Sequence, residues 1–343
     1  QALSQVSYYK QIRPLFQAKC QGCHQPAKAK GKYIMTGFDL MLKGGDSKDI
    51  AIVPGKPGES HLLEMITPIK GEAEMPQKAK PLHSTEIALI KKWIEQGAKD
   101  DTPINAKQQI DKDHPPIYTQ PPVITSMNFS PKGDILAVAG FHEVLLISTK
   151  DWSQIGRLIG VAQRIESVSF SPDGSKLAVS GGLPARMGEI QIWHVAKQKL
   201  ELSVPITYDT VYGVSWSPDG SKIAFGCGDN TVRAIDAKTG KQLVFMAAHG
   251  DWAQGTVFSM DNKSIFSVSR DKTVKQTDVA TQRFIGNVTT HTPGVLRGGM
   301  LSIARHPKRN EILAGGADGV PKLFRMTTKA APAGGGNPNQ IRK

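Results

Sequence analysis

Apolar residues at the start of the chain recur at the spacing of a helix. In SQVSYYKQIRPLFQAKC, residues 4–20, four of them lie three or four positions apart: Val6, Tyr9, Ile12 and Phe16. This periodicity predicts an amphipathic helix, and Pro14 predicts that the helix starts or kinks there.

Two further helices are expected before residue 99. A short one is expected at 59–66. The segment 84–98, STEIALIKKWIEQGA, shows the strongest helical pattern, with an apolar stripe and its neighbours at Ile87, Ile90, Ile94, Leu89 and Trp93. Ser84 is the expected N-cap and Gly97 the expected C-terminal stop.

Beyond residue 121 the pattern changes to short alternating runs between turns. Five turn sequences, NFSPKG, SFSPDG, SWSPDG, VFSMDN and ARHPKR, recur 41 to 47 residues apart, with anchors at Ser130, Ser171, Ser217, Ser259 and His306. In SVSFSPDGSKLAVSGG the turn separates two strands whose inward-facing candidates are Val168, Phe170, Leu177 and Val179. Second turns are expected at 228–230, 270–272 and 317–319. Four short strands in a unit of about 40 residues indicate a propeller blade.

These patterns predict a multidomain protein. Residues 1–99 form a compact, mostly α domain, 100–121 a polar, proline-rich linker, and 122–329 five blades of an all-β propeller. Residues 330–343 are expected to be flexible and then to lead into a further blade, so that the chain stops inside a longer propeller. A five-bladed ring or an open fragment is the alternative.

The net charge of the chain bears only on the kind of partner that the protein binds. The formal net charge is +13, which favours a partner with an acidic or anionic surface, although a solvated lysine-rich surface is the plainer interpretation. The basic residues are scattered, without the basic stripe of a nucleic-acid-binding protein. No apolar run is long enough to predict a transmembrane span.

The motif CQGCH, residues 20–24, has three interpretations. Two thiols three residues apart, followed at once by histidine, are the attachment pattern of a c-type haem. A closed zinc site needs four ligands, and the chain has only one other cysteine, Cys227. A redox dithiol is expected at a helix start after a strand, whereas the flanks here are helical or loop-like. Haem is favoured, and the other two remain alternatives.

A haem that transfers electrons usually takes a second axial ligand, often methionine. Met75 is the favoured candidate, because it lies in an extended loop before the last helix, next to Pro76. His83 is the main alternative. The other candidates are expected to be core fillers or surface residues: Met35, Met41, Met65 and His61.

The segments IRPLFQAKCQGCH, LKGGDS, IVPGKPGESHLLEMI, EMP and EIALIKKWIEQGA occur in this order. Together they resemble the planctomycete-type cytochrome c domain over residues 7–98. The resemblance implies one covalent haem c held by Cys20 and Cys23, with His24 as the proximal and Met75 as the distal iron ligand. It also implies maturation outside the cytoplasm, so a periplasmic or otherwise extracytoplasmic location is expected. A first residue Gln1 agrees with export.

The repeats resemble WD repeats. GEIQIWHV, residues 188–195, has His194 where that family has aspartate, and AAHGDW, residues 247–252, resembles its Gly-His corner with Ala248 in place of glycine. Members of the planctomycete cytochrome family often carry such repeats after the haem domain.

Other motifs carry less chemistry. LKGGDS lacks the ending of a phosphate-binding loop and is expected to be a turn beside the haem. Cys227 is expected to be a buried structural thiol on a blade strand. No nucleophile, base and oxyanion donor are visible together in the blades, where the histidines are spread: His142, His194, His249, His291 and His306.

Three functions are compatible with this organisation. The favoured one is an extracytoplasmic monohaem cytochrome that transfers single electrons to or from a redox partner protein, with the propeller as a docking platform. The alternatives are an oxidoreductase whose propeller holds a second cofactor, and a haem-bearing envelope or assembly scaffold, in which the chain belongs to a larger assembly.

Overall fold

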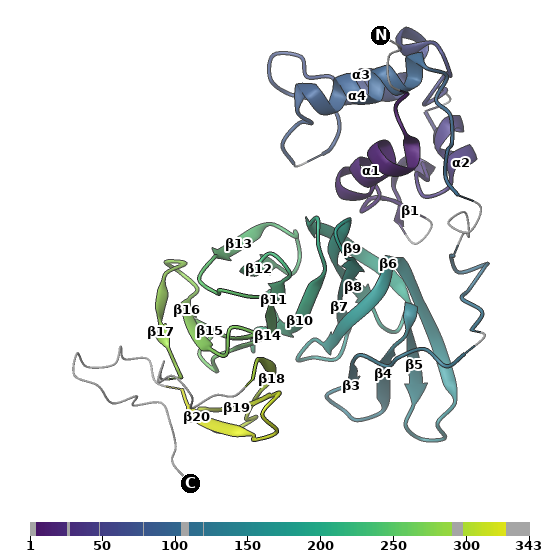
Figure 1. Cartoon of the computed structure of the whole chain (residues 1–343). Helices are drawn as coiled ribbons and strands as arrows, with labels where there is room; N and C mark the ends of the chain where they lie inside the picture. The colour runs from purple at the N-terminus through teal and green to yellow at the C-terminus, as the bar shows by residue number, and fades with distance from the viewer. Residues whose placement is uncertain are drawn as a thin grey trace. The chain divides into compact units, whose positions relative to one another are not determined.

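The computed structural model of the chain describes residues 5–25, 28–47, 49–77, 79–103, 110–118, 120–289 and 298–326. The chain divides into two compact units (Figure 1). The first comprises residues 1–117 with 159–161, and the second comprises 118–158 with 162–343. The expected further blade at 330–343 and His291 lie outside the described residues.

The first unit is built from short helices. Its elements are η1 (Tyr8–Ile12), α1 (Arg13–Lys19), β1 (His24–Gln25), β2 (Lys28–Ala29), η2 (Lys30–Lys32), α2 (Phe38–Lys43), η3 (Pro57–Glu59), α3 (His61–Ile66) and α4 (Ser84–Glu95). Pro14 lies in the first turn of α1, where its missing N–H costs no hydrogen bond, so the predicted start or kink is confirmed.

Aromatic side chains form the centre of this unit. Trp93 of α4 is buried, and its ring stacks on Tyr8 at 5.4 Å and meets Phe16 and Phe38 edge-on at 6.3 and 6.2 Å. The predicted apolar stripe of α4 is confirmed, since Ile90 and Ile94 are buried with Trp93. These contacts tie the last helix to the first one.

The expected N-cap of α4 was wrong by one residue. His83 is the N-cap: its Nδ1 accepts the Thr85 N–H at 3.3 Å, and the Glu86 carboxylate accepts the His83 N–H at 2.8 Å. A histidine ring therefore fills the role that a serine hydroxyl usually has, and Ser84 becomes the first helical residue. The predicted stop is confirmed, because Gly97 follows the C-cap with a φ of +93°.

The second unit consists of antiparallel sheets with seven, four, four and three strands. The strands are β3 (Met127–Phe129), β4 (Ile135–Ala139), β5 (Phe141–Ser148), β6 (Gln154–Phe170), β7 (Lys176–Leu183), β8 (Met187–His194), β9 (Lys199–Thr207), β10 (Val211–Trp216), β11 (Lys222–Cys227), β12 (Val232–Asp236), β13 (Gln242–Met246), β14 (Ala253–Phe258), β15 (Ser264–Ser269), β16 (Val274–Asp278), β17 (Phe284–Asn287), β18 (Met300–Arg305), β19 (Glu311–Gly316) and β20 (Lys322–Arg325). The arrangement is that of a WD-like propeller, in which the 17-residue strand β6 runs through the first two blades. The third, fourth and fifth blades are β10–β13, β14–β17 and β18–β20.

The predicted turns have a common geometry. In four of them the last residue of the quoted turn sequence has a left-handed φ between +61° and +74°. These residues are Gly133, Gly174, Gly220 and Asn262. Only glycine and asparagine adopt this conformation readily, which explains the recurring residue types. The degraded fifth turn substitutes a side chain: His306 Nδ1 accepts the N–H groups of Lys308 and Arg309 at 3.0 and 2.8 Å.

The inward-facing candidates Val168, Phe170, Leu177 and Val179 are all buried, as predicted. The inward–outward alternation is wrong for the central strands, however: every residue of β15 is buried. Blades pack face to face, so that Phe266 faces the fifth blade's core and Ile265 faces the third's. A strand between two neighbours has no solvent side.

A buried hydrogen-bond chain holds the fourth blade together. His249 Nδ1 lies 2.9 Å from Asp271 Oδ2, His249 Nε2 lies 2.8 Å from Ser267 Oγ, and Thr273 Oγ1 donates to Asp271 Oδ1 at 2.6 Å. Burial raises the pKa of Asp271, but the hydrogen bonds from His249, Thr273 and the Gly250 N–H outweigh it and hold that pKa well below its usual range.

Replacing Asp271→Asn is expected to destabilise the propeller unit by about 1–3 kcal/mol at neutral pH, because charge-assisted hydrogen bonds are lost inside the blade. The folded-state pKa of Asp271 is depressed, so its contribution is present above the unfolded pKa near 4 and is lost as the pH falls below it. Urea unfolding followed by far-ultraviolet circular dichroism measures this.

Glu201→Gln is the matched control, since Glu201 forms a half-exposed ion pair with Lys176 at 2.9 Å and is expected to change stability by less than about 0.5 kcal/mol. Equal effects of the two variants, or a wild-type advantage over Asp271→Asn that grows below pH 4, would contradict this assignment.

Candidate functional site

The CQGCH motif forms one turn that continues α1. The Cys20 N–H donates to the Phe16 carbonyl at 2.9 Å as a further helical bond. The Cys20 carbonyl then accepts the N–H groups of Cys23 and His24, each at 3.1 Å. The motif therefore places two thiols and an imidazole on a single turn at the end of a packed helix. Both thiols are free and half-buried.

Burial raises the pKa of the Cys20 thiol to about 12, with a smaller contribution from the neighbouring Cys23. At neutral pH Cys20 is therefore a protonated thiol rather than a thiolate. A dithiol that acts as a redox catalyst needs the opposite, a thiol pKa lowered towards or below neutrality. This difference argues against the redox-dithiol alternative.

The backbone of His24 is fixed by two neighbouring segments of the chain. It begins β1, which pairs with β2 through His24 and Ala29, and its carbonyl accepts the Met35 N–H at 2.8 Å. Its ring lies 5.2 Å from the ring of Tyr33, whose hydroxyl donates to the Met41 carbonyl at 2.8 Å. The imidazole thus sits against a tyrosine that is itself anchored to the core.

One ring nitrogen of His24 has no hydrogen-bond partner among the described residues. The Nδ1 atom is buried and makes no hydrogen bond with any described residue. Burial also lowers the pKa of His24, which favours the neutral imidazole. A neutral histidine is the form that ligates metals, and a buried polar atom without a partner calls for an explanation. The residues of this turn therefore fit a haem, with His24 as an iron ligand.

Two glutamines complete the turn and were missed in the sequence. Gln21 Nε2 donates to the Met35 carbonyl at 2.9 Å, and Gln25 Nε2 donates to the Gln21 carbonyl at 3.0 Å. Both side chains are almost fully buried, at 3% and 1% exposure. No sequence signal pointed to either, because neither the variable position of Gln21 within the motif nor the position of Gln25 directly after it shows which side chain points inward.

Met75 and Cys20 border the same buried core, against which both are half-buried. The Met75 N–H donates to the Met65 carbonyl, 2.9 Å away, which fixes the loop to the last turn of α3. Met35 and Met41 are core fillers as predicted, with 1% and 0% exposure.

The alternative distal ligands have other partners. His83 Nδ1 lies 2.8 Å from Thr85 Oγ1 at the start of α4, and His61 Nδ1 lies 3.1 Å from Glu64 Oε2. Both contacts use Nδ1 of the ring, so Met75 remains the favoured distal residue because of its place in the loop before α4 rather than by elimination. Within the described ranges, no three His, Cys, Asp or Glu side chains converge in a metal-binding group.

The propeller unit contains an arrangement that resembles a hydrolase triad. Ser267, His249 and Asp271 are hydrogen-bonded in that order, although the sequence showed no such set. The side chain of His249 and the whole of Ser267 are 0% exposed, so no substrate can reach them. The chain is structural, like Cys227, which is buried on β11 as predicted and whose pKa burial raises to about 12.

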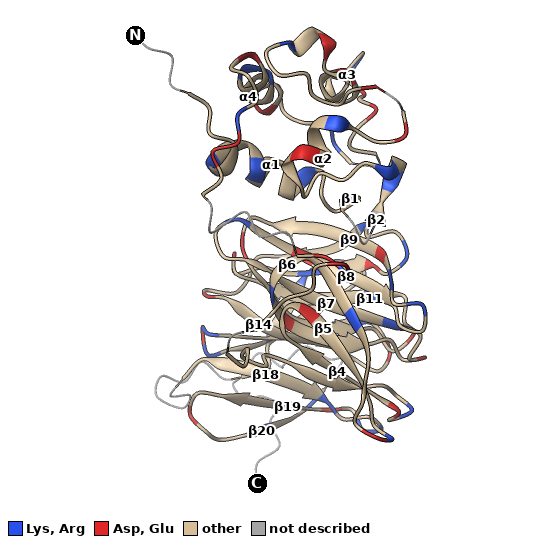
Figure 2. Ribbon diagram, turned by 90° about the vertical axis from the view of Figure 1, so that its right-hand side faces the viewer, with Lys and Arg blue, Asp and Glu red and all other residues tan. Residues whose placement is uncertain are grey.

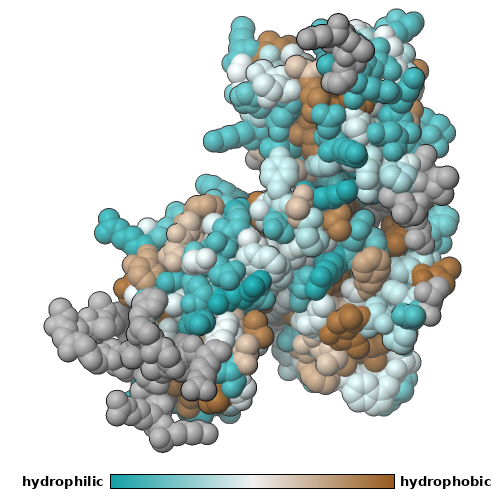
Figure 3. Space-filling model, in the orientation of Figure 1, coloured by the Kyte–Doolittle hydropathy of each residue, from teal (hydrophilic) through white to brown (hydrophobic). Residues whose placement is uncertain are grey.

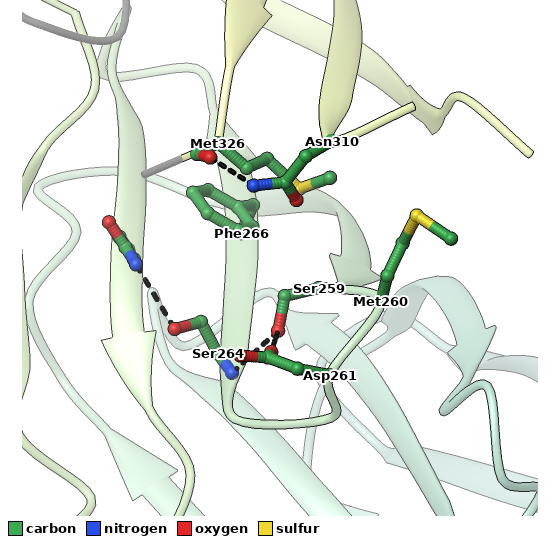
Figure 4. A pocket seen from close by; sticks show the side chains of 8 residues that line it. Ser259, Met260, Asp261, Ser264, Phe266, Asn310 and Met326 are labelled. Atoms are coloured by element: carbon green, nitrogen blue, oxygen red, sulfur yellow. Dashed lines mark hydrogen bonds between the residues drawn. The ribbon is translucent and has the colours of Figure 1, made fainter. Parts of the chain in front are cut away.

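A cavity of about 230 Å³ lies between the fourth and fifth blades (Figure 4). Its walls include Ser264, Phe266 and Gln276 from one blade and Asn310 and Met326 from the other. The polar side chains bond to partners beside them: Gln276 Nε2 donates to Ser264 Oγ at 3.0 Å, and Asn310 Nδ2 donates to the Met326 carbonyl. We assign no ligand to this cavity.

In the ribbon view of Figure 2, positions of Lys and Arg lie among positions of Asp and Glu in both units. Hydrophobic side chains are likewise scattered among hydrophilic ones on the face shown in Figure 3. None of the described helices has the length and apolar character needed to cross a membrane.

Comparisons with known protein families match one segment in each of the two units. Residues 20–78 match the family described as planctomycete cytochrome C. Residues 183–261 match the WD40 domain of anaphase-promoting complex subunit 4. The first match begins at Cys20 and includes Cys23, His24 and Met75, and the second covers the strands from β8 to β14.

Two curated proteins are similar over part of this chain. A ribosome biogenesis protein WDR12 homolog of Chlamydomonas reinhardtii is 32% identical over 107 residues, which cover 29% of this chain and 24% of that protein. A WD repeat-containing protein 91 homolog of Dictyostelium discoideum is 25% identical over 117 residues, which cover 34% of this chain and 15% of that protein. This chain thus matches a quarter or less of either relative. The chain thus joins a segment that matches the planctomycete cytochrome C family to a region of WD repeats.

Proposed function

We propose that this protein is a monohaem c-type cytochrome that transfers single electrons, with its WD repeats as a platform for docking a protein partner. The observation that carries the proposal is the turn of residues 20–24. There two half-buried thiols stand one turn apart, beside a neutral imidazole whose buried Nδ1 has no partner among the described residues. Cys20 and Cys23 would hold the haem covalently, His24 would be its proximal ligand and Met75 its distal ligand.

The residues of the first unit have separable roles in this proposal. Haem c supplies a one-electron iron couple when it is bound. Cys20 and Cys23 would hold the haem covalently. Because Cys20 is the C-cap of α1, this attachment point is part of a helix that packs in the core. Burial lowers the pKa of His24, which favours the neutral imidazole that can ligate iron. A thioether from Met75 favours the ferrous state and raises the potential.

The proposal extends to location and partner. Covalent haem attachment of this type takes place outside the cytoplasm, so a periplasmic or otherwise extracytoplasmic protein is proposed. The formal charge of +13 supports a redox partner with an acidic surface, because opposite charges steer association. WD-type blades offer exposed loops at the ends of their strands, and interaction is the function such surfaces commonly serve.

The double variant Cys20→Ala, Cys23→Ala is expected to lose covalently retained haem, because no thiol remains for the thioether bonds. Haem staining after denaturing electrophoresis measures retention. The matched control is Cys227→Ala, which removes a buried thiol on β11 in the other unit and is expected to retain haem fully. Retention by the double variant, or a wild-type chain that carries none, would refute the assignment.

Met75→Ala is expected to lower the midpoint potential by on the order of 0.1 V or more while haem stays bound, because axial ligands shift potentials over roughly 0.8 V. A redox titration followed by absorption, together with the ferric methionine–iron charge-transfer band, measures the change. His83→Ala is the control and is expected to leave both unchanged, since His83 is a helix cap. A normal potential in Met75→Ala combined with a shift in His83→Ala would exchange their roles.

A further inference from the structure

Three side chains stack on the exposed surface of the propeller unit: Tyr212, Trp252 and Arg270. The rings of Tyr212 and Trp252 are 5.8 Å apart and 19° from parallel. The Arg270 guanidinium lies over the Trp252 ring, with Cζ 4.6 Å from its centroid. Trp252 is 37% exposed and the Arg270 side chain 46% exposed. This group, the Arg270 stack, plays no part in the proposed haem site.

The backbone of two adjacent blades brings the aromatic rings together. Tyr212 belongs to β10 of the third blade, and Trp252 immediately precedes β14 of the fourth. The strands approach closely beside them, since a Cβ on Gly213 would lie 2.4 Å from the Cα of Gly255. Glycine at 213 therefore permits an approach that any side chain would block.

The buried chain of the fourth blade positions the arginine. Asp271 is bonded to His249 and to the Gly250 N–H, so the turn after β15 is tied to the corner before β14. The Arg270 N–H also donates to the Trp252 carbonyl at 3.1 Å. Arg270 and Trp252 are thus held on two segments that the interior locks to each other.

The guanidinium of Arg270 keeps its hydrogen-bonding capacity. It makes no hydrogen bond with any described residue, and its one ion pair, to Asp251 Oδ2, spans 3.7 Å. Asp251 Oδ1 meanwhile accepts the Trp252 N–H at 2.7 Å. Arg233, which also lies over an aromatic ring, differs: it donates to Thr231 Oγ1, to the Ile206 carbonyl and to Asp229.

An arginine of this kind suits a carboxylate. Its planar fork matches the two oxygens of a carboxylate, and stacking on Trp252 restricts the side chain before any partner arrives, which lowers the entropy lost on binding. Tryptophan, tyrosine and arginine are also the residues most enriched at energetically dominant interface positions.

We propose that the Arg270 stack binds the carboxylate of an aspartate or glutamate side chain on a protein partner. This rests on the proposed docking function of the propeller and names its contact point. A dianionic phosphate or a nucleic acid is disfavoured, because Asp251 lies beside the single guanidinium and would repel a higher charge more strongly.

Fluorescence anisotropy of the haem-loaded chain at low ionic strength tests the proposal. The probe is a fluorescein-labelled hexapeptide with four consecutive glutamates, and the same peptide with glutamines is its control. Arg270→Gln is expected to weaken binding of the glutamate peptide by about tenfold or more. Arg270→Lys is expected to weaken it by about threefold or more, since lysine keeps the charge but lacks the fork.

Arg283→Gln is the matched control, because Arg283 is an exposed arginine of the same blade, between β16 and β17. It is expected to leave the affinity within a factor of about two. Equal losses for Arg283→Gln and Arg270→Gln, full binding by Arg270→Lys, no binding by the wild type, or displacement by equimolar inorganic phosphate would each overturn the proposal.

Haem content and midpoint potential, measured on the same variants, separate this proposal from the function on which it rests. If Arg270→Gln binds the peptide as the wild type does and has normal haem, the carboxylate site at the Arg270 stack is refuted and the proposed cytochrome function is not affected. Loss of peptide binding by Arg270→Gln in a chain without haem would support the stack and remove the cytochrome function.

Discussion

One carbonyl oxygen, that of Cys20, holds the candidate haem-binding turn in shape. It accepts the N–H groups of both Cys23 and His24, so the two thiols and the imidazole belong to one turn and cannot separate without breaking it. That turn closes α1, whose Phe16 packs against Trp93 of α4. The chemistry proposed for the first unit depends on this link between a local hydrogen bond and a distant core contact.

The propeller unit uses a similar device for another purpose. The bonds from Asp271 to His249 and Gly250 join two segments 21 and 22 residues apart in the sequence, and the exposed Arg270 and Trp252 are carried by those segments. In both units an interior hydrogen bond positions groups at the surface or at its edge. In each unit the candidate groups are therefore tied by hydrogen bonds to the core behind them.

Local features were predictable from the sequence because they follow from one residue type or one period. The interruption at Pro14, the stripe of α4 and the left-handed turn positions of the blades are of this kind. The turn of CQGCH is too, since its residues are adjacent in the chain.

Features that depend on contacts between distant residues were not predictable. Gln21 meets the carbonyl of Met35 only after β1 and β2 have paired, and β15 is buried on both faces only because blades flank it. The histidine N-cap of α4 was not predicted, because His83 and Ser84 are neighbours and either could cap the helix. The hydrogen bond from the His83 N–H to the Glu86 carboxylate places the cap at His83. Spacing alone does not contain this information.

A reduced-minus-oxidised absorption spectrum, recorded with the intact mass of the purified chain, tests the central claim most directly. The account predicts the sharp α and β bands of a low-spin c-type haem and a mass increased by one haem group. A featureless difference spectrum together with the mass of the bare polypeptide would contradict it.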